Sequence, residues 1–161
     1  MKKILITFLL MFTFIQPSLG AGSSGDGSGS KTDYEKALKF VKQAKKYDNK
    51  GKTDKAQARY LKAQKLLIKS NKEIPNQADT LNYLGFTTRK RGDFENGEKY
   101  YLEGLAIKPN HIGINEYLGE LYVATGRMDL AKERLNVLKN CNCNEYEELK
   151  EVIEGKKKSK Y

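Results

Sequence analysis

Residues 81–109 read LNYLGFTTRKRGDFENGEKYYLEGLAIKP, and much of this pattern returns in residues 115–138, NEYLGELYVATGRMDLAKERLNVL. The pair Leu84-Gly85 recurs 34 residues later as Leu118-Gly119. In both copies the apolar residues follow the spacing of amphipathic helices, and a glycine near the middle of each copy separates two such stretches. A period of this length is typical of stacked helix–turn–helix units. The sequence therefore predicts successive pairs of antiparallel helices.

Small and large residues alternate at matched places in the two copies. Gly85 and Gly119 lie on the first helices, where the missing side chain lets a facing helix come close. Small residues on the second helices and larger ones that fill the remaining space complete the pattern, as close packing requires. The small residues are Gly97 and Ala131, and the large ones are Tyr101 and Leu135.

Glycines and prolines mark the ends of the predicted helices. Gly51, Gly92 and Gly126 lie where the first helix of each pair is expected to end and the chain to turn back. Pro75 and Pro109 separate the pairs, and the asparagine that follows each proline is a predicted helix N-cap.

A looser copy precedes these two and begins near Asp33. Its Ala44 corresponds to Gly85 but lies 41 residues before it, so the first pair is expected to be about seven residues longer, close to two helical turns. Repeats are predicted at about 33–75, 78–110 and 112–140, followed by a capping helix at 144–154. The predicted fold is an all-α solenoid of about three helix–turn–helix repeats plus this cap.

This pattern resembles the tetratricopeptide-repeat (TPR) family over about residues 33–153. The end of the helical region, CNCNEYEEL at residues 141–149, resembles the ending of small exported bacterial TPR proteins. The resemblance implies a TPR-type α-solenoid that binds other polypeptides. In the middle copy it is carried by Leu81, Leu84, Gly85, Gly92, Phe94, Gly97, Tyr101, Gly104, Leu105 and Pro109.

The resemblance also implies a binding groove lined by the first helix of each repeat. An aromatic floor beside asparagine and arginine suits a peptide backbone and an acidic side chain. Arg89 and Tyr83 are the expected anchors for a partner. The full set implied for the groove is Lys42, Lys45, Asn82, Tyr83, Phe86, Arg89, Lys90, Glu116, Tyr117 and Glu120.

The ends of the chain have a different composition from the helical region. Residues 1–20 combine Lys2 and Lys3, an apolar run and small residues at the end, which is typical of a signal peptide. Cleavage is expected near Gly20/Ala21, and the mature protein is expected in the periplasm or secreted. Residues 21–32 are a predicted disordered Gly/Ser linker, and residues 155–161 a basic disordered tail.

Cys141 and Cys143 are the only cysteines, and three interpretations of them stay open. The first is a disulfide between the two, which an even count in an exported chain favours. The second is two free thiols or an intermolecular bond. The third is a soft-metal or redox-active site, for which a third ligand would be needed. His111 follows Pro109-Asn110 and is expected at a helix entrance, exposed to solvent.

The residue types needed for catalysis do not cluster in the sequence. It contains one histidine, no nucleophile motif and no paired acids apart from amphipathic helices, so we predict neither an enzyme nor a bound cofactor or metal. The net charge is +10, but lysines and acids are interspersed, which does not favour nucleic-acid binding.

The leading hypothesis is therefore a non-catalytic scaffold in the bacterial cell envelope that binds a partner polypeptide, an acidic one in view of the lysines. One alternative is a thiol- or metal-handling protein that uses Cys141 and Cys143. A second is weak electrostatic binding of the lysines to anionic membrane or cell-wall polymer.

Overall fold

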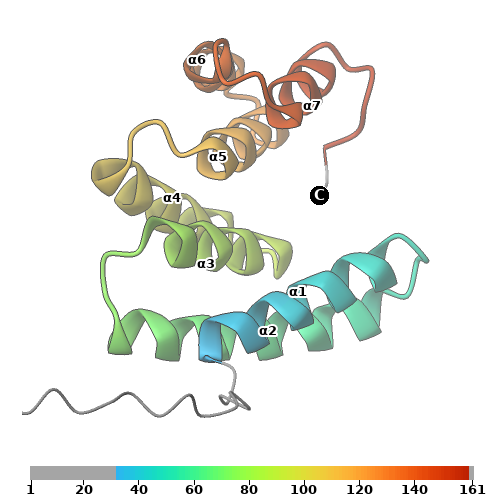
Figure 1. Ribbon diagram of the computed structural model, residues 1–161. Helices are drawn as coiled ribbons and strands as arrows, with labels where there is room; N and C mark the ends of the chain where they lie inside the picture. The colour runs from blue at the N-terminus through green and yellow to red at the C-terminus, as the bar shows by residue number, and fades with distance from the viewer. Residues whose placement is uncertain (1–31, 160–161) are drawn as a thin grey trace, which may run out of the picture.

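The computed structural model of the protein describes residues 32–159. The predicted signal peptide and all of the predicted linker except Thr32 lie outside the described residues, as do residues 160–161. Residues 32–159 contain α-helices and no β-strand (Figure 1). The helices are α1 Asp33–Asp48, α2 Thr53–Glu73, α3 Ala78–Lys90, α4 Phe94–Ile107, α5 Ile112–Ala124, α6 Met128–Leu138 and α7 Asn144–Ile153.

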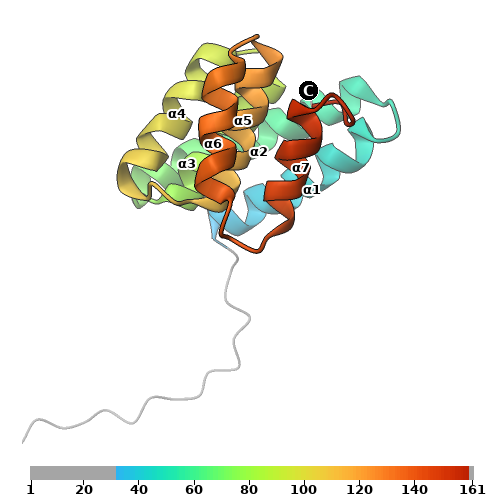
Figure 2. The same ribbon diagram turned by 90° about the horizontal axis from the view of Figure 1, so that it is seen from above.

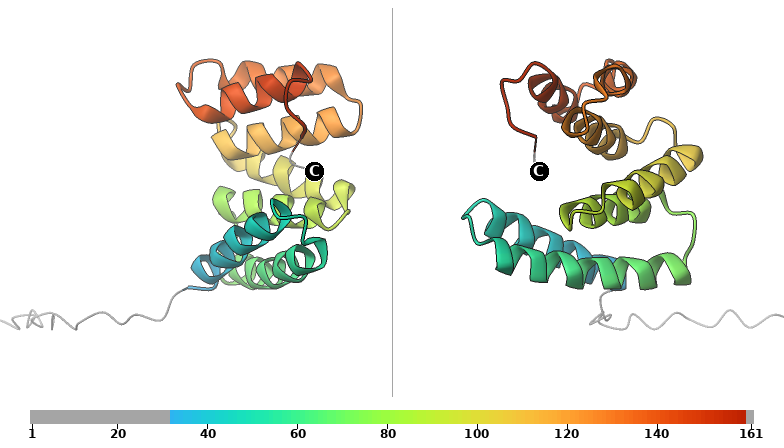
Figure 3. Two further views of the ribbon diagram at one scale, coloured as in Figure 1. Left: turned by 90° about the vertical axis from the view of Figure 1, so that its right-hand side faces the viewer. Right: turned by 180° about the vertical axis from the view of Figure 1, so that it is seen from behind.

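Successive helices pair as hairpins, α1 with α2, α3 with α4 and α5 with α6. The hairpins stack in chain order, and α7 packs on α5 and α6 at the end of the stack (Figures 2 and 3). One continuous apolar core runs from α1 to α6. This arrangement confirms the predicted all-α solenoid of helix–turn–helix repeats with a capping helix. The longer first hairpin owes its length mainly to α2, which has 21 residues against 14 in α4.

The turn inside each hairpin depends on a glycine. Gly51, Gly92 and Gly126 have φ values of +66°, +90° and +75°. This left-handed conformation is easy for glycine and unfavourable for residues with a Cβ atom, so glycine ends each first helix at low cost.

The connections between hairpins differ from the sequence prediction. The N-cap of α3 is Gln77 rather than the asparagine after Pro75, and that Asn76 adopts φ +60° instead. The N-cap of α5 is His111, whose Nδ1 accepts a hydrogen bond from the backbone N–H of Ile114 at 3.1 Å. The predicted asparagine caps are therefore wrong, because the chain needs one further residue to turn into each helix.

His111 is also buried, which corrects the prediction that it would be exposed. Its residue is only 7% exposed, and its Nε2 lies 3.1 Å from an Asp79 carboxylate oxygen on α3. Because Nδ1 accepts the capping bond, a neutral ring carries its proton on Nε2 and donates it to Asp79. The histidine thus joins the start of α5 to the start of α3.

Gly85 provides the closest approach inside the middle hairpin. A Cβ built on Gly85 would lie 2.5 Å from the ring of Tyr101, which is fully buried on α4. Tyr101 thus fills space between the helices, as the sequence predicted. In the next hairpin the expected partner was Leu135, but the space above Gly119 is filled by Leu149 of α7. The capping helix therefore packs into the third hairpin directly.

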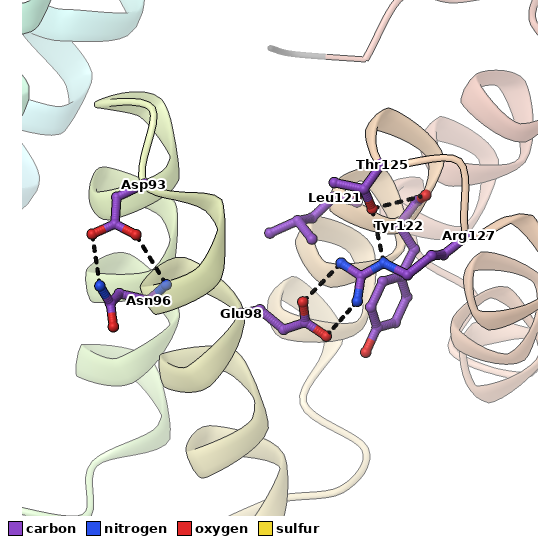
Figure 4. A network of polar contacts seen from close by, with 7 residues as sticks. All are labelled: Asp93, Asn96, Glu98, Leu121, Tyr122, Thr125 and Arg127. Atoms are coloured by element: carbon purple, nitrogen blue, oxygen red, sulfur yellow. Dashed lines mark hydrogen bonds and ion pairs between the residues drawn. The ribbon is translucent and has the colours of Figure 1, made fainter.

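A polar contact also joins the second and third hairpins (Figure 4). The Arg127 guanidinium donates two hydrogen bonds to the Glu98 carboxylate, at 2.8 and 2.7 Å, and lies over the Tyr122 ring at 4.5 Å. Two parallel bonds fix the orientation of both side chains as well as their separation. Figure 4 also shows Asp93 capping α4 through the backbone N–H of Asn96.

The substitution Gly85→Ala tests the close approach. An alanine in a helix normally stabilises relative to glycine, but here the new methyl group meets a buried ring. We expect the free energy of unfolding to fall by about 1–3 kcal/mol, as measured by urea denaturation. Gly113→Ala is the control, because its Cβ would meet only the end of the Asn82 side chain, at 2.9 Å. Equal effects of the two substitutions would contradict the packing role of Gly85.

Candidate functional site

A cavity of about 580 Å³ opens between the first two hairpins and the segment that follows α7. We call it the α1–α3 cavity. Residues from three helices and from two segments outside them line it. They are Lys45 and Asp48 of α1, Asn49 at the end of α1, Tyr60 of α2, Phe86 and Lys90 of α3, and Lys157 beyond α7.

Aromatic rings form the inner wall of this cavity. Tyr60 and Phe86 are 0% and 1% exposed and meet edge to face, with ring centroids 5.8 Å apart. The Tyr117 ring of α5 lies behind Phe86 at 5.0 Å. These contacts link the first, second and third hairpins, because each ring comes from a different one. The inner wall is therefore fixed by packing, and its rings are buried.

Lysine side chains from two hairpins lie at the cavity. The Lys45 ammonium group donates to the Tyr117 hydroxyl at 2.9 Å and lies 4.6 Å above the centre of the Phe86 ring. The Lys90 ammonium group lies 2.8 Å from an Asp48 carboxylate oxygen. Both cations thus lie at the edge of the aromatic wall, where their aliphatic parts cover apolar surface.

Asp48 is held by two donors at once. The Tyr60 hydroxyl donates to the same carboxylate oxygen at 2.7 Å. Burial raises the pKa of Tyr60 above its ordinary value, and the hydrogen bond to Asp48 raises it further. The phenol therefore stays protonated and acts as a donor. Asp48 is committed to contacts within the chain, and its role is to position Lys90 and Tyr60.

Arg89 lies in the interior rather than at the cavity surface. Its side chain is 0% exposed, with one guanidinium nitrogen 3.2 Å from the equally buried Glu120 carboxylate. Another guanidinium nitrogen donates to the Tyr117 backbone oxygen at 2.7 Å. The structure corrects the expectation that Arg89 anchors a partner, because a side chain without exposed surface cannot contact one. Arg89 instead joins α3 to α5.

The other predicted groove residues divide by exposure. Lys42 is exposed, while Lys45, Tyr83 and Lys90 are half-buried and can contact a ligand. Tyr83 packs edge to face on Tyr34 of α1, with ring centroids 6.2 Å apart, and does not line the cavity. The remaining residues are inaccessible because α3 and α5 lie in the middle of the stack; they are Asn82, Phe86, Arg89, Glu116, Tyr117 and Glu120.

Sequence reasoning missed four residues that line the cavity. Asp48, Asn49 and Tyr60 belong to the degenerate first repeat, where polar and aromatic residues near the end of one helix and the start of the next were the only signal. Lys157 carried no signal, because its position depends on a turn after α7. The structure brings it to the cavity from a segment that was predicted to be disordered.

Cys141 and Cys143 are bonded to each other in the turn between α6 and α7. Their Cα atoms are 5.2 Å apart, and both residues are half-buried. Asn142 between them has φ +48°, a conformation that asparagine tolerates better than most residues. The structure thus has the first of the three predicted arrangements. Within residues 32–159 no group of three or more His, Cys, Asp or Glu side chains is placed to hold a metal ion.

No family model and no curated protein matches the sequence. Among solved structures, a matching chain is described as "First TPR of Spaghetti (RPAP3) bound to HSP90 peptide SRMEEVD". The identity is 21% and the TM-score 0.49, over 79% of this chain and 98% of that chain. So distant a likeness does not transfer the ligand of that protein, and the function proposed below is based on the α1–α3 cavity.

The buried pair of Arg89 and Glu120 makes a testable prediction for stability. Arg89→Ala removes the guanidinium nearest to a buried carboxylate, so we expect a loss of about 3–5 kcal/mol in the free energy of unfolding. The double variant Arg89→Met, Glu120→Gln should lose less than the sum of Arg89→Met alone and Glu120→Gln alone, because it removes both charges together. Chemical denaturation of the unaltered protein, these two single variants and the double variant gives the coupling energy.

Lys99→Ala is the matched control, because it removes an exposed ion pair with Glu95 on one helix. It should leave the unfolding midpoint nearly unchanged. Additive effects of the Arg89 and Glu120 substitutions would contradict their coupling.

Proposed function

We propose that this protein is a non-catalytic scaffold that binds a partner polypeptide in the α1–α3 cavity, on the face formed by the first helices of the repeats. The observation that carries the proposal is a cavity that combines a fixed aromatic wall with ammonium groups from separate hairpins. Its volume of about 580 Å³ is suited to one or two side chains of a bound segment.

The chemistry of the cavity suits an acidic segment. Lys45 and Lys90 offer positive charge, and their ammonium groups lie over the buried rings of Phe86 and Tyr60. A carboxylate of a bound segment gains free energy by contacting these ammonium groups. Charge on the rim also accelerates encounter with an acidic partner.

We propose further that the protein acts in the bacterial cell envelope, in the periplasm or after secretion. The support is the charge and apolar pattern of residues 1–20, which is that of a signal peptide. Within the part of the chain that the structure describes, no helix combines the length and apolar character needed to cross a bilayer.

A thiol- or metal-handling role is the alternative function. Its support is that both cysteines lie together in a half-buried turn, bonded to each other. Metal binding would need the bond reduced, because thiolates are the ligands. Stoichiometric zinc or copper retained after dialysis of the reduced protein, and lost in Cys141→Ser, Cys143→Ser, would favour this alternative over a scaffold.

Site-specific photocrosslinking in cells tests the scaffold. A photoreactive residue at Asn49, on the exposed edge of the cavity, should crosslink to a discrete partner polypeptide identified by mass spectrometry. The same residue at Lys132 is the control, because α6 contributes no lining residue and the Lys132 side chain is 62% exposed. Adding Lys45→Met and Lys90→Met should reduce the crosslink at Asn49, since methionine keeps the apolar stem and removes the charge.

Crosslinks of equal yield at both positions would show that the cavity is not the binding face. Circular dichroism of the charge-removed protein verifies that it is folded.

Export makes a separate prediction. The protein recovered from the cell envelope or the medium should begin near Ala21, because signal peptidase cleaves after small residues. Intact-mass measurement gives the new N-terminus. Recovery of the uncleaved chain from the cytoplasm alone would contradict the proposed location. It would not contradict the proposed binding site.

A further inference from the structure

The first hairpin carries most of the excess positive charge of the chain. Residues 33–73 contain thirteen Lys and Arg against five Asp and Glu, a net charge of +8. Residues 74–159 contain thirteen Lys and Arg against fourteen Asp and Glu, a net charge of −1. The count includes every acid of each segment, so ion pairs within the first hairpin do not remove its excess. The hairpin of α1 and α2 is therefore strongly basic, while the rest of the stack is nearly neutral.

The cations of α2 form a row along one side of the helix. They recur at steps of three or four residues, which makes successive side chains neighbours on a helix surface. The row extends over about 26 Å, at about 1.5 Å per residue. Between its first and last members, residues 55–72, the sequence contains no Asp or Glu. The members are Lys55, Arg59, Lys62, Lys65, Lys69 and Lys72, of which Arg59 is half-buried and the others are exposed.

Such a row is unfavourable for the helix, because like charges one turn apart repel each other. Lysines on later helices are instead paired along their own helix, as Lys99 is with Glu95 of α4 at 2.8 Å, and α6 and α7 contain similar pairs. On α2, Asp33 and Glu73 both contact Lys69, at 2.6 and 3.6 Å, near the end of the row. Solubility alone does not require an uninterrupted row of cations, so the row on α2 indicates binding to an anionic target.

The row lies beside α1 at one end of the stack. The Arg59 guanidinium and the Lys62 ammonium group each lie 5.8 Å from the centre of the Phe40 ring of α1. Lys36 of α1 contacts Asp33, as Lys69 of the row does. Figures 1 and 3 show α1 and α2 together at this end, with α3 on one side of the pair. We call the surface formed by the row and Lys36 the basic face.

An apolar side chain lies among these cations. Ile68 is 50% exposed, and it lies three residues after Lys65 and four before Lys72, so the three side chains are neighbours on α2. A bilayer surface suits both kinds of side chain, because its headgroups attract cations and its acyl chains accept apolar groups. A soluble polyanion, such as an acidic peptide or a nucleic acid, would contact the cations and leave Ile68 in water. The combination therefore favours a lipid surface.

We propose that the basic face binds the surface of an anionic lipid bilayer. Ammonium groups of the row contact the phosphates of the headgroups, and each contributes about five-fold to the affinity for such a surface. Ile68 inserts at the boundary between headgroups and acyl chains. The row contributes no residue to the lining of the α1–α3 cavity, so this proposal does not rest on the proposed function.

Sedimentation with vesicles of equal parts phosphatidylcholine and phosphatidylglycerol tests the proposal. Binding to pure phosphatidylcholine is subtracted, because it measures contacts that need no anionic lipid, including those of the apolar residues 4–15. The remaining binding should fall as salt is added, since exposed charges are screened. The triple variant Lys55→Gln, Lys65→Gln, Lys72→Gln should bind about 100-fold more weakly, from three losses of about five-fold each.

A second triple variant is the matched control for net charge. Lys108→Gln, Lys132→Gln, Lys139→Gln removes three exposed lysines from outside the first hairpin and should change the affinity by less than about three-fold. Urea denaturation should show that the variant of the row is at least as stable as the unaltered protein, because repulsion along α2 is relieved. Equal losses of binding in the two triple variants would show that only net charge matters, and would overturn the basic face.

The apolar contact distinguishes a bilayer from a soluble polyanion. Ile68→Gln should weaken vesicle binding by about five-fold and leave binding to polyglutamate unchanged, because only the bilayer accepts an apolar group. Leu102→Gln on α4 is its control, since Leu102 is 48% exposed and lies away from the basic face. Equal effects of Ile68→Gln and Leu102→Gln on vesicle binding, or an unaltered protein that binds polyglutamate but not the anionic vesicles, would refute the lipid surface as the target.

Discussion

The contact between Gly85 and the Tyr101 ring is the constraint on which the stack depends. The Tyr101 ring of α4 occupies the space that a Cβ on Gly85 would need, and α3 also contacts α2 and α5 of the neighbouring hairpins. A Cβ atom at residue 85 would push α4 outward and disturb the side chains that α3 presents to α1, α2 and α5. The aromatic wall of the cavity includes Phe86, the next residue, so its position follows from the same close approach.

Polar groups in the centre of the stack hold neighbouring hairpins together. Between α3 and α5 the Arg89 guanidinium donates to the Glu120 carboxylate and to the Tyr117 carbonyl, and the Lys45 ammonium group donates to the Tyr117 hydroxyl. Such buried charges are costly to desolvate and need a fixed geometry. They hold the second and third hairpins at one relative position, which leaves ligand contacts to side chains at the edge of the cavity.

The α1–α3 cavity is assembled from residues at both ends of the helical region. Asp48 and Tyr60 come from the first hairpin, and Lys157 comes from the segment after α7. A cavity built in this way changes shape when either end moves, whereas its aromatic wall is fixed by packing. The bond between Cys141 and Cys143 lies in the turn between α6 and α7 and restrains the start of α7.

The sequence alone determined that the chain folds as stacked helical hairpins. The repeat of Leu84-Gly85 as Leu118-Gly119 indicates successive helix pairs of similar length. A glycine such as Gly92 ends a helix through its own backbone conformation, which depends only on neighbouring residues. It could not determine which groove side chains are accessible: Arg89 resembles a surface cation in the sequence, and only the position of α3 between two hairpins buries it. Nor could it place Leu149 against Gly119 or Lys157 at the cavity. Those contacts depend on the total rotation of the stack between the first hairpin and α7. This rotation is the sum of the packing angles between successive helices, and a local sequence pattern does not predict it.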